Sequence, residues 1–219
     1  MTKITHNLKH TIKTAKKRSN SSARWLNRQL HDVFTIKAQN EGYRSRSAYK
    51  IEGIDNKFNI INKSTLILDI GAAPGGWSQV ARKKSKPSTK IWALDILEME
   101  PLNGVNFMQY DITTSHNKIK EKIGRPDLIM SDIAPSFCGI AETDHLRSID
   151  LCESVLELAE EVLCINGSLV LKIFHGRDEP NFFTRVSKMF NSIKRFKPPA
   201  SRKESGEFYY IALSFKGKH

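Results

Sequence analysis

The stretch Asp69-Ile-Gly-Ala-Ala-Pro-Gly-Gly-Trp77 decides the fold, because it joins a short apolar strand to a helix through a glycine-rich loop. Glycines let a backbone approach a ligand closely, and the first amides of the following helix face an anionic group. The spacing of Gly71, Gly75 and Gly76 is not that of GxGxxG, and the GK[ST] of a phosphate-binding P-loop is missing. The loop therefore predicts a nucleoside cofactor whose anionic group is a carboxylate rather than a pyrophosphate.

On both sides of the loop, short apolar strands alternate with helices. The expected strands are residues 65–69, 90–95, 105–110, 127–131, 167–176, 193–196 and 208–215. The expected helices are residues 24–42, 44–58, 75–84, 143–164 and 182–190. This alternation predicts an α/β fold with a doubly wound, mostly parallel sheet that binds ligands where its parallel strands end. The last two strands are joined without a helix, so we expect them to pair antiparallel.

Two acids follow successive strands at that edge. Asp95 ends the second strand, at about the separation from the loop where a ribose-binding acid is expected, and Asp111 follows the third, where it could accept from an adenine amino group. Together with the glycine loop they predict S-adenosylmethionine as the cofactor. The alternative is that each acid is an ordinary turn or helix-capping residue.

The charge distribution points to a polyanionic partner. Lys and Arg outnumber Asp and Glu by 35 to 23, a net charge of +12, and residues 1–28 hold eight basic residues and no acidic one. We expect a basic arm over residues 1–22, with Lys16, Lys17 and Arg18 as RNA phosphate contacts, and a single domain over residues 23–219. A solubilising tail, a membrane-surface helix and a mitochondrial transit peptide are the alternatives for the arm.

Several classes of protein are excluded by what the sequence lacks. The three cysteines form no CxxC pair and no His/Cys cluster with metal-ligand spacing, so neither a disulfide framework nor a metal site is predicted. No apolar run is long enough to span a bilayer, and no signal-peptide core is present. We therefore expect a protein of a reducing compartment without a membrane partner.

A lysine lies inside the apolar stretch Gly167-Ser-Leu-Val-Leu-Lys-Ile-Phe-His-Gly176. An unpaired ammonium buried in a strand would cost several kcal/mol, so Lys172 either lies near the open end of its strand or is chemically useful. From this segment alone, a lysine whose stem lies along the core while its head reaches water is the favoured interpretation.

Seven motifs together resemble one family, the FtsJ/RlmE-type ribosomal RNA ribose 2′-O-methyltransferases. They are SSARWL (21–26), GYRSRSAYK (42–50), LDIGAAPGGWSQ (68–79), SDIAP (131–135), DHLRS (144–148), LKIFHG (171–176) and SGEFYYIA (205–212). The resemblance implies a Rossmann-like S-adenosylmethionine-dependent methyltransferase fold, a mostly parallel seven-stranded sheet flanked by helices with an antiparallel last strand. It also implies a catalytic Lys-Asp-Lys-Glu tetrad and cofactor contacts. The tetrad falls on Lys50, Asp132, Lys172 and Glu207, and the cofactor contacts on Gly71, Gly75, Trp77, Asp95, Asp111 and Asp132.

The resemblance also implies the substrate, a uridine ribose in the A loop of large-subunit rRNA, preferably within ribosomal particles. Two departures are the longer arm and Ser136, which stands where an asparagine often follows this motif. The alternatives are a methyltransferase of the same fold acting on tRNA or an mRNA cap, and a non-catalytic RNA-binding assembly factor. We expect a monomer in the bacterial cytoplasm, with the mitochondrial matrix as the alternative.

These assignments predict a division of labour in the tetrad. A neutral ribose hydroxyl is a poor nucleophile, so methyl transfer needs a group that relieves it of its proton. Lys172 is the candidate general base, and it can act only as the uncharged amine, which burial and the cation of Lys50 favour. Asp132 orients Lys172 and touches the methionine part of the cofactor, and Lys50 and Glu207 position the others. Arg44 and Arg46 are further candidates for the RNA backbone.

Overall fold

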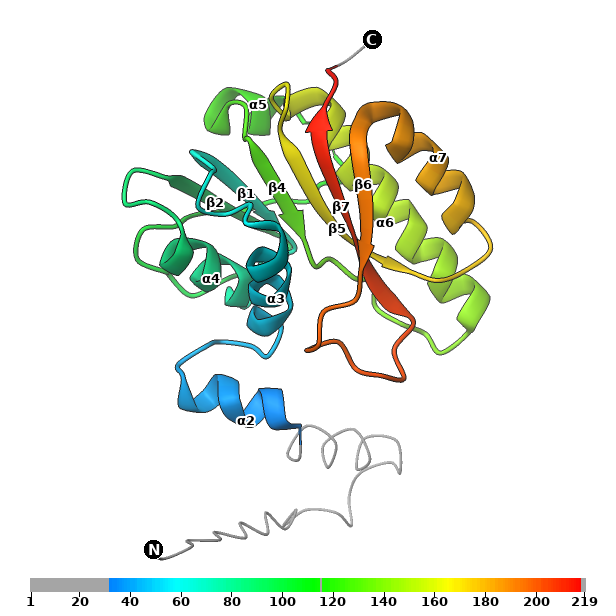
Figure 1. Cartoon of the computed structure of the whole chain (residues 1–219), viewed down its shortest axis with the longest axis horizontal. Coiled ribbons are helices and arrows are strands. Elements are labelled where there is room, and N and C mark those ends of the chain that lie inside the picture. The colour runs from blue at the N-terminus through cyan, green and yellow to red at the C-terminus, as the bar shows by residue number, and fades with distance from the viewer. Residues whose placement is uncertain (1–31, 115, 218–219) are drawn as a thin grey trace, which may run out of the picture.

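The computed structural model describes residues 32–114 and 116–217. Its centre is a seven-stranded sheet in the order β3-β2-β1-β4-β5-β7-β6 (Figure 1). The strands are β1 (Leu66–Ile70), β2 (Lys90–Asp95), β3 (Asn106–Gln109), β4 (Leu128–Ser131), β5 (Ser168–Phe174), β6 (Phe190–Phe196) and β7 (Glu207–Phe215). Strands β1 to β5 pair parallel, whereas β7 pairs antiparallel with both β5 and β6. The predicted fold class and the antiparallel pairing of the last two strands are confirmed.

Helices cover both faces of the sheet. They are α2 (Val33–Asn40), α3 (Ala48–Phe58), α4 (Gly76–Lys84), α5 (Asn117–Ile123), α6 (Ala141–Val162) and α7 (Glu179–Met189). Buried side chains of α2, α3 and α4 form one core with one face of the sheet, and those of α5, α6 and α7 form a second core with the other face. Successive strand residues alternate between the two cores, as the pleat of a strand requires: Val170 and Tyr209 face α3, while Leu171 and Tyr210 face α6.

The sequence-based boundaries need two corrections. Of the helix expected over residues 24–42, the part before residue 32 lies outside the described residues, and the described helix α2 begins only at Val33, because Asp32 has extended backbone and its Oδ1 accepts hydrogen bonds from the amides of Phe34 and Thr35 as the N-cap. Helix α5 was not predicted. The other described boundaries agree with the expected ones to within four residues, and β2 matches at both ends. The expected basic arm, with Lys16, Lys17 and Arg18, and the boundary after residue 22 lie outside the described residues.

The carboxyl edge of the sheet, where β1 to β5 end, is the edge that matters for function. Because β7 runs antiparallel to β5, its first residue, Glu207, pairs with Phe174 at the end of β5 and therefore lies at the carboxyl edge. The start of α3 also reaches this edge, and α2 lies beyond it in Figure 1. The ends of β4 and β5, the start of β7 and the start of α3 therefore meet at this edge.

Candidate active site

The four tetrad residues come together at the carboxyl edge from four elements. Lys50 lies in the first turn of α3, Asp132 directly follows β4, Lys172 lies in β5, and Glu207 begins β7. Ser131 pairs with Leu171, so the next residues on the two strands, Asp132 and Lys172, are neighbours. Lys172, like Tyr209, lies on the α3 side of the sheet, and this is why Lys50 can reach the same carboxylate.

The tetrad forms a continuous chain of alternating charges. Nζ of Lys50 lies 2.8 Å from Oε1 of Glu207 and 3.6 Å from Oδ1 of Asp132, and Nζ of Lys172 lies 3.2 Å from the same Asp132 oxygen. All four side chains are largely buried, and that of Lys172 is only 6% exposed. Removing such charges from water is costly unless they are paired, so this mutual neutralisation makes the arrangement tenable. Lys172 does not reach into solvent along the core, and the interpretation favoured from its segment alone is wrong.

The hydrogen bonds of Lys172 leave one direction open. Its Nζ donates to the main-chain carbonyl of Asp132 at 2.5 Å and faces the carboxylate of the same residue. A neutral amine has two N–H donors and one lone pair, whereas an ammonium has three donors and no lone pair. If the amine is uncharged, these two contacts with Asp132 can use both of its N–H donors and leave its lone pair directed away from Asp132.

Tyr209 completes this cluster, and sequence reasoning missed it. Its hydroxyl donates a 2.6 Å hydrogen bond to Oδ1 of Asp132, and Tyr209 pairs directly with Lys172 across β5 and β7. Burial raises the pKa of Tyr209 well above its usual value, so the hydroxyl keeps its proton and acts as a donor. The signal was present in the sequence, because residues two apart on a strand share a face, and Glu207 and Tyr209 are two apart.

The charge state of Asp132 follows from its neighbours. Burial by itself would raise the pKa of Asp132, but Lys172, Lys50 and the hydrogen bonds from Tyr209 and Lys172 outweigh burial and hold it below its usual value. Asp132 is therefore an anion at neutral pH. It is the fixed negative centre to which both lysines are held.

The glycine loop lies beside this cluster, between β1 and α4. Gly71 has a φ of +71° and Gly75 a φ of +113°, values that favour glycine. A Cβ on Gly71 would lie 3.0 Å from the backbone of Ile133, one residue past Asp132. The loop is therefore packed against the start of the segment that carries the tetrad aspartate. Asp95 also holds the loop, because its Oδ2 accepts from the amide of Ala73 at 2.8 Å.

The structure places the other predicted cofactor contacts as follows. Trp77 is 2% exposed, donates from its indole to the carbonyl of Ser47 and packs against Tyr209, with ring centroids 5.7 Å apart. Oδ1 of Asp95 accepts from the amide of Leu97, and Oδ1 of Asp111 accepts from the amide and hydroxyl of Thr113. Both acids thus shape turns. Since a carboxylate has about four acceptor sites, these turn contacts leave capacity for a ligand's hydroxyl or amino groups.

A further buried acid lies under the loop. Asp69, at the end of β1, accepts a 2.6 Å hydrogen bond from the hydroxyl of Ser78. Burial raises the pKa of Asp69 to about 7, with contributions from the negative charges of Asp132 and Asp95, while the Ser78 hydrogen bond opposes the rise. Sequence analysis had treated this residue only as the end of a strand.

The two arginines predicted to contact RNA have partners within the protein. Arg44 donates through Nη1 to the carbonyls of Pro74 (3.1 Å) and Glu100 (2.6 Å), and through Nη2 to that of Pro101 (2.7 Å). Its guanidinium therefore ties the glycine loop to the segment after β2. Arg46 forms an ion pair with Asp32 and donates to the carbonyl of Ala200.

A cavity of about 240 Å³ lies next to the tetrad. It is lined by Arg46, Ser47, Lys50, Arg202, Ser205 and Glu207. Nε of Arg46 and Nε of Arg202 are buried without a hydrogen-bond partner, although Arg202 lies 3.5 Å from a carboxylate oxygen of Asp32. Unsatisfied buried donors are uncommon, and here they lie beside a polar cavity that opens on the tetrad.

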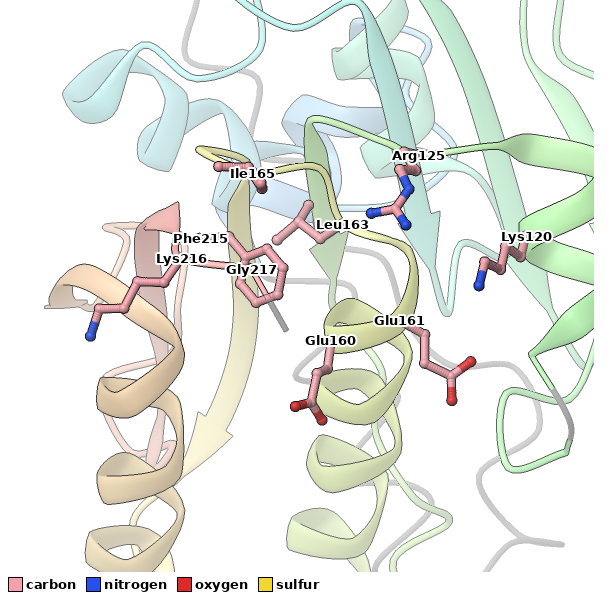
Figure 2. Close-up of a pocket in the computed structure, with 9 residues that line it drawn as sticks. All are labelled: Lys120, Arg125, Glu160, Glu161, Leu163, Ile165, Phe215, Lys216 and Gly217. Atoms are coloured by element: carbon pink, nitrogen blue, oxygen red, sulfur yellow. The ribbon is translucent and has the colours of Figure 1, made fainter. Parts of the chain in front are cut away.

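A second cavity, of about 410 Å³, lies at the opposite edge of the sheet (Figure 2). Its lining includes Lys120 from α5, Glu160 and Glu161 from α6, and Phe215 from the end of β7. No predicted site residue lines it.

Within residues 32–114 and 116–217 there is no helix able to cross a membrane and no group of three or more acidic, His or Cys side chains that could hold a metal ion.

The family of the chain follows from its similarity to known proteins. A family described as FtsJ-like methyltransferase matches residues 43–215. The chain belongs to this family. The matched residues of this FtsJ-like methyltransferase contain the glycine loop and all four tetrad positions. Membership confirms the resemblance and the enzyme class inferred from the motifs.

Individual relatives agree over nearly the whole length. The ribosomal RNA large subunit methyltransferase E of Zymomonas mobilis is 44% identical over 210 residues, covering 94% of this chain and 95% of that protein. The protein of the same name from Rickettsia felis is 44% identical over 213 residues, covering 94% of both. A crystal structure from Plasmodium falciparum, named as a ribosomal RNA methyltransferase, is 32% identical with a TM-score of 0.71, covering 80% of this chain and 100% of that one.

Proposed function

We propose that this methyltransferase transfers a methyl group from S-adenosylmethionine to the ribose 2′-hydroxyl of a uridine in large-subunit rRNA, on the assembled or assembling large ribosomal subunit. The observation that carries the proposal is the chain of ion pairs Glu207–Lys50–Asp132–Lys172, in which Lys172 is buried and contacts two oxygens of Asp132. Large-subunit rRNA is supported as the substrate by the names of the protein's relatives, which match 94% of the chain.

The cofactor would be held at the glycine loop. S-adenosylmethionine, when bound, supplies an electrophilic methyl group on a sulfonium. Gly71, Gly75 and Trp77 would shape its pocket, while Asp95 and Asp111 would accept from its ribose and adenine. This fit is supported by the contact of Asp95 with the amide of Ala73 in the loop, and by Asp111 lying just past the end of β3, the strand that pairs with β2.

Lys172 is the proposed general base. It removes the proton from the 2′-hydroxyl while that oxygen becomes methylated, which requires the amine to be uncharged when RNA binds. Asp132 fixes the direction of the lone pair by occupying both N–H donors. Asp132 also favours the ammonium form, and the cation of Lys50, 3.6 Å from the same carboxylate oxygen, offsets that effect. Glu207 holds Lys50 in place at 2.8 Å.

The RNA backbone would run from the basic arm, with Lys16, Lys17 and Arg18, to the cavity at Arg46. The buried and unsatisfied Nε atoms of Arg46 and Arg202 suit a phosphate group next to the ribose held at the tetrad. Arg44 would contribute mainly through the loop that it ties down, because its guanidinium donates to three backbone carbonyls. We further propose that the protein acts as a monomer in the cytoplasm.

The test is transfer of labelled methyl groups to large ribosomal subunits, free rRNA and tRNA in parallel, followed by mapping of the modified nucleotide. We expect large subunits to be the best substrate and the label to lie on a uridine ribose. Transfer to tRNA alone, or to a base rather than a ribose, would contradict the proposal. No transfer to any of the three, by protein that binds the cofactor, would favour a non-catalytic assembly factor.

The role of Lys172 is tested with Lys172→Ala. Loss of a general base lowers turnover by about 10²- to 10⁴-fold, so we expect kcat on large subunits to fall in that range while cofactor affinity, measured by calorimetry, stays unchanged. Lys194→Ala, an exposed lysine on the edge strand β6, is the matched control. A folded, cofactor-binding Lys172→Ala variant with near wild-type turnover would rule out Lys172 as the base.

A further inference from the structure

One exposed aromatic side chain stands at the carboxyl edge without a role in the tetrad. Phe137, in the segment between β4 and α6, is 55% exposed. Of the large apolar side chains found exposed in residues 32–114 and 116–217, it is the aromatic one; the others are Val33, Ile36, Ile96, Leu97, Ile140, Leu146 and Ile165. Full burial of a phenylalanine side chain is worth about 1.5–3 kcal/mol, and the exposed part of Phe137 leaves some of this available to a ligand.

The Phe137 ring is held in position before any substrate arrives. It packs edge-on against Phe174 at the end of β5, with ring centroids 5.5 Å apart and planes at 80°. The next two residues are fixed by Asp144 of α6, whose carboxylate accepts from the amides of Cys138 at 2.7 Å and Gly139 at 2.9 Å. The ring therefore has one packing partner, the backbone after it is held by Asp144, and the residue is still 55% exposed.

Phe174 links this ring to the tetrad lysine. Nζ of Lys172 lies 5.8 Å from the centroid of Phe174, the ring on which Phe137 packs. Phe174 is also the residue that pairs with Glu207 in the β5–β7 register. The segment that carries Phe137 begins at Asp132, so the same stretch of chain supplies the tetrad anion and the exposed ring. A ribose at Lys172 would hold its own base within reach of Phe137.

We propose that Phe137 is the platform on which the base of the methylated nucleotide stacks. The inference rests on the proposed function, because it needs an RNA ribose at Lys172. Unpaired bases of RNA are commonly bound by stacking on aromatic side chains, and the net charge of +12 favours a nucleic acid over an apolar protein partner. Because every base offers a π-face, this contact provides affinity and orientation rather than choice of base.

The experiment compares wild type with Phe137→Ala, Phe137→Leu and Phe137→Tyr on large ribosomal subunits that lack the modification. Phe137→Leu keeps an apolar side chain but removes the ring, whereas Phe137→Tyr keeps the ring. We expect the alanine and leucine variants to raise KM for subunits by about 5- to 100-fold with kcat within about twofold of wild type. Phe137→Tyr should restore KM, and cofactor affinity should be the same in all four proteins.

Ile140→Ala is the matched control, because Ile140 is 62% exposed on the same segment and carries no ring. Its KM should stay within about twofold of wild type. The inference is overturned if KM of Phe137→Leu equals that of wild type, or if KM of Ile140→Ala rises as much as that of Phe137→Ala. It is also overturned if Phe137→Ala and Phe137→Leu lose cofactor affinity in proportion to activity. A wild-type protein that methylates no ribosomal subunit overturns the proposed function itself, and the stacking role with it.

Discussion

The hydroxyl of Tyr209 donates a 2.6 Å hydrogen bond to Oδ1 of Asp132, the same oxygen that faces Lys50 and Lys172. One carboxylate oxygen therefore serves two cations and one neutral donor. Tyr209 is not a candidate to touch the substrate in our proposal. Tyr209 acts through Asp132, so it is a positioning residue. Its removal should alter the charge state of the tetrad but leave the tetrad assembled.

Tyr209→Phe keeps the ring and removes the hydrogen bond. A hydrogen bond to a charged group contributes about 1.5–3 kcal/mol, so we expect kcat to fall by about 10- to 100-fold, with KM for ribosomal subunits unchanged. The intact bond lowers the pKa of Asp132, so its removal raises that pKa and makes the carboxylate a stronger partner for the ammonium of Lys172; the acid limb of the kcat–pH profile should therefore move to higher pH. An unshifted acid limb in a less active variant would indicate a packing defect instead.

Arg44→Ala tests the link between the glycine loop and the segment after β2. Removing the guanidinium leaves three backbone carbonyls without their donor, so the loop should lose its fixed position. We expect the Kd for S-adenosylmethionine to rise by about 5- to 50-fold, while the salt dependence of RNA binding changes little. Lys63→Ala removes the same charge from an exposed turn and is the control. A loss confined to RNA affinity would instead support Arg44 as a phosphate contact.

Asp69 should make stability depend on pH. Its pKa is about 7 in the folded protein and near 3.8 in the unfolded chain, so between these values only the folded state holds the proton. The contribution of Asp69 to the free energy of unfolding therefore decreases as pH rises from about 4 to 7 and is constant above. Asp69→Asn cannot titrate, and its free energy of unfolding relative to wild type should rise by up to a few kcal/mol across that window.

Denaturant titrations of both proteins from pH 4 to 8 measure this difference. Ser78→Ala provides a second check, because removing the hydrogen bond from Ser78 should raise the pKa of Asp69 further and move the window to higher pH. Wild type and Asp69→Asn curves that run parallel over the whole range would show that Asp69 is ionised throughout.

The basic arm predicts steep salt dependence of RNA binding. Replacing Lys16, Lys17 and Arg18 together by alanine should reduce the slope of log K against log salt by about 2 to 3, because each phosphate contact releases bound counterions. The same replacement of Lys120, Lys122 and Lys216, which lie at the opposite edge of the sheet, removes equal charge and should leave the slope almost unchanged. Equal effects of the two triple variants would mean that the arm acts only through net charge.

What could be predicted from the sequence reflects local pattern. The strand around Lys172 and the loop at Gly71 were predicted because apolar runs and glycine spacing are local properties. The role of Arg44 could not be predicted from the sequence. The three carbonyls that it binds are 30 to 57 residues away along the chain, and only folding brings them together. The strand period places Tyr209 on the same face as Glu207, but its hydrogen bond to Asp132 spans 77 residues, so the partner could not be predicted for the same reason.

The place of β7 in the sheet has a consequence for how the enzyme is made. This last strand lies between β5 and β6, so β6 has no neighbour in the sheet until β7 is inserted. Glu207 and Tyr209 arrive with it and meet Lys50, synthesised more than 150 residues earlier. A nascent or truncated chain that ends before β7 can hold a glycine loop and three of the four tetrad residues, yet it has no partner for Lys50 at its other side. If the tetrad acts as proposed, catalytic competence coincides with completion of the sheet, and we expect an unfinished polypeptide on the ribosome to be inactive.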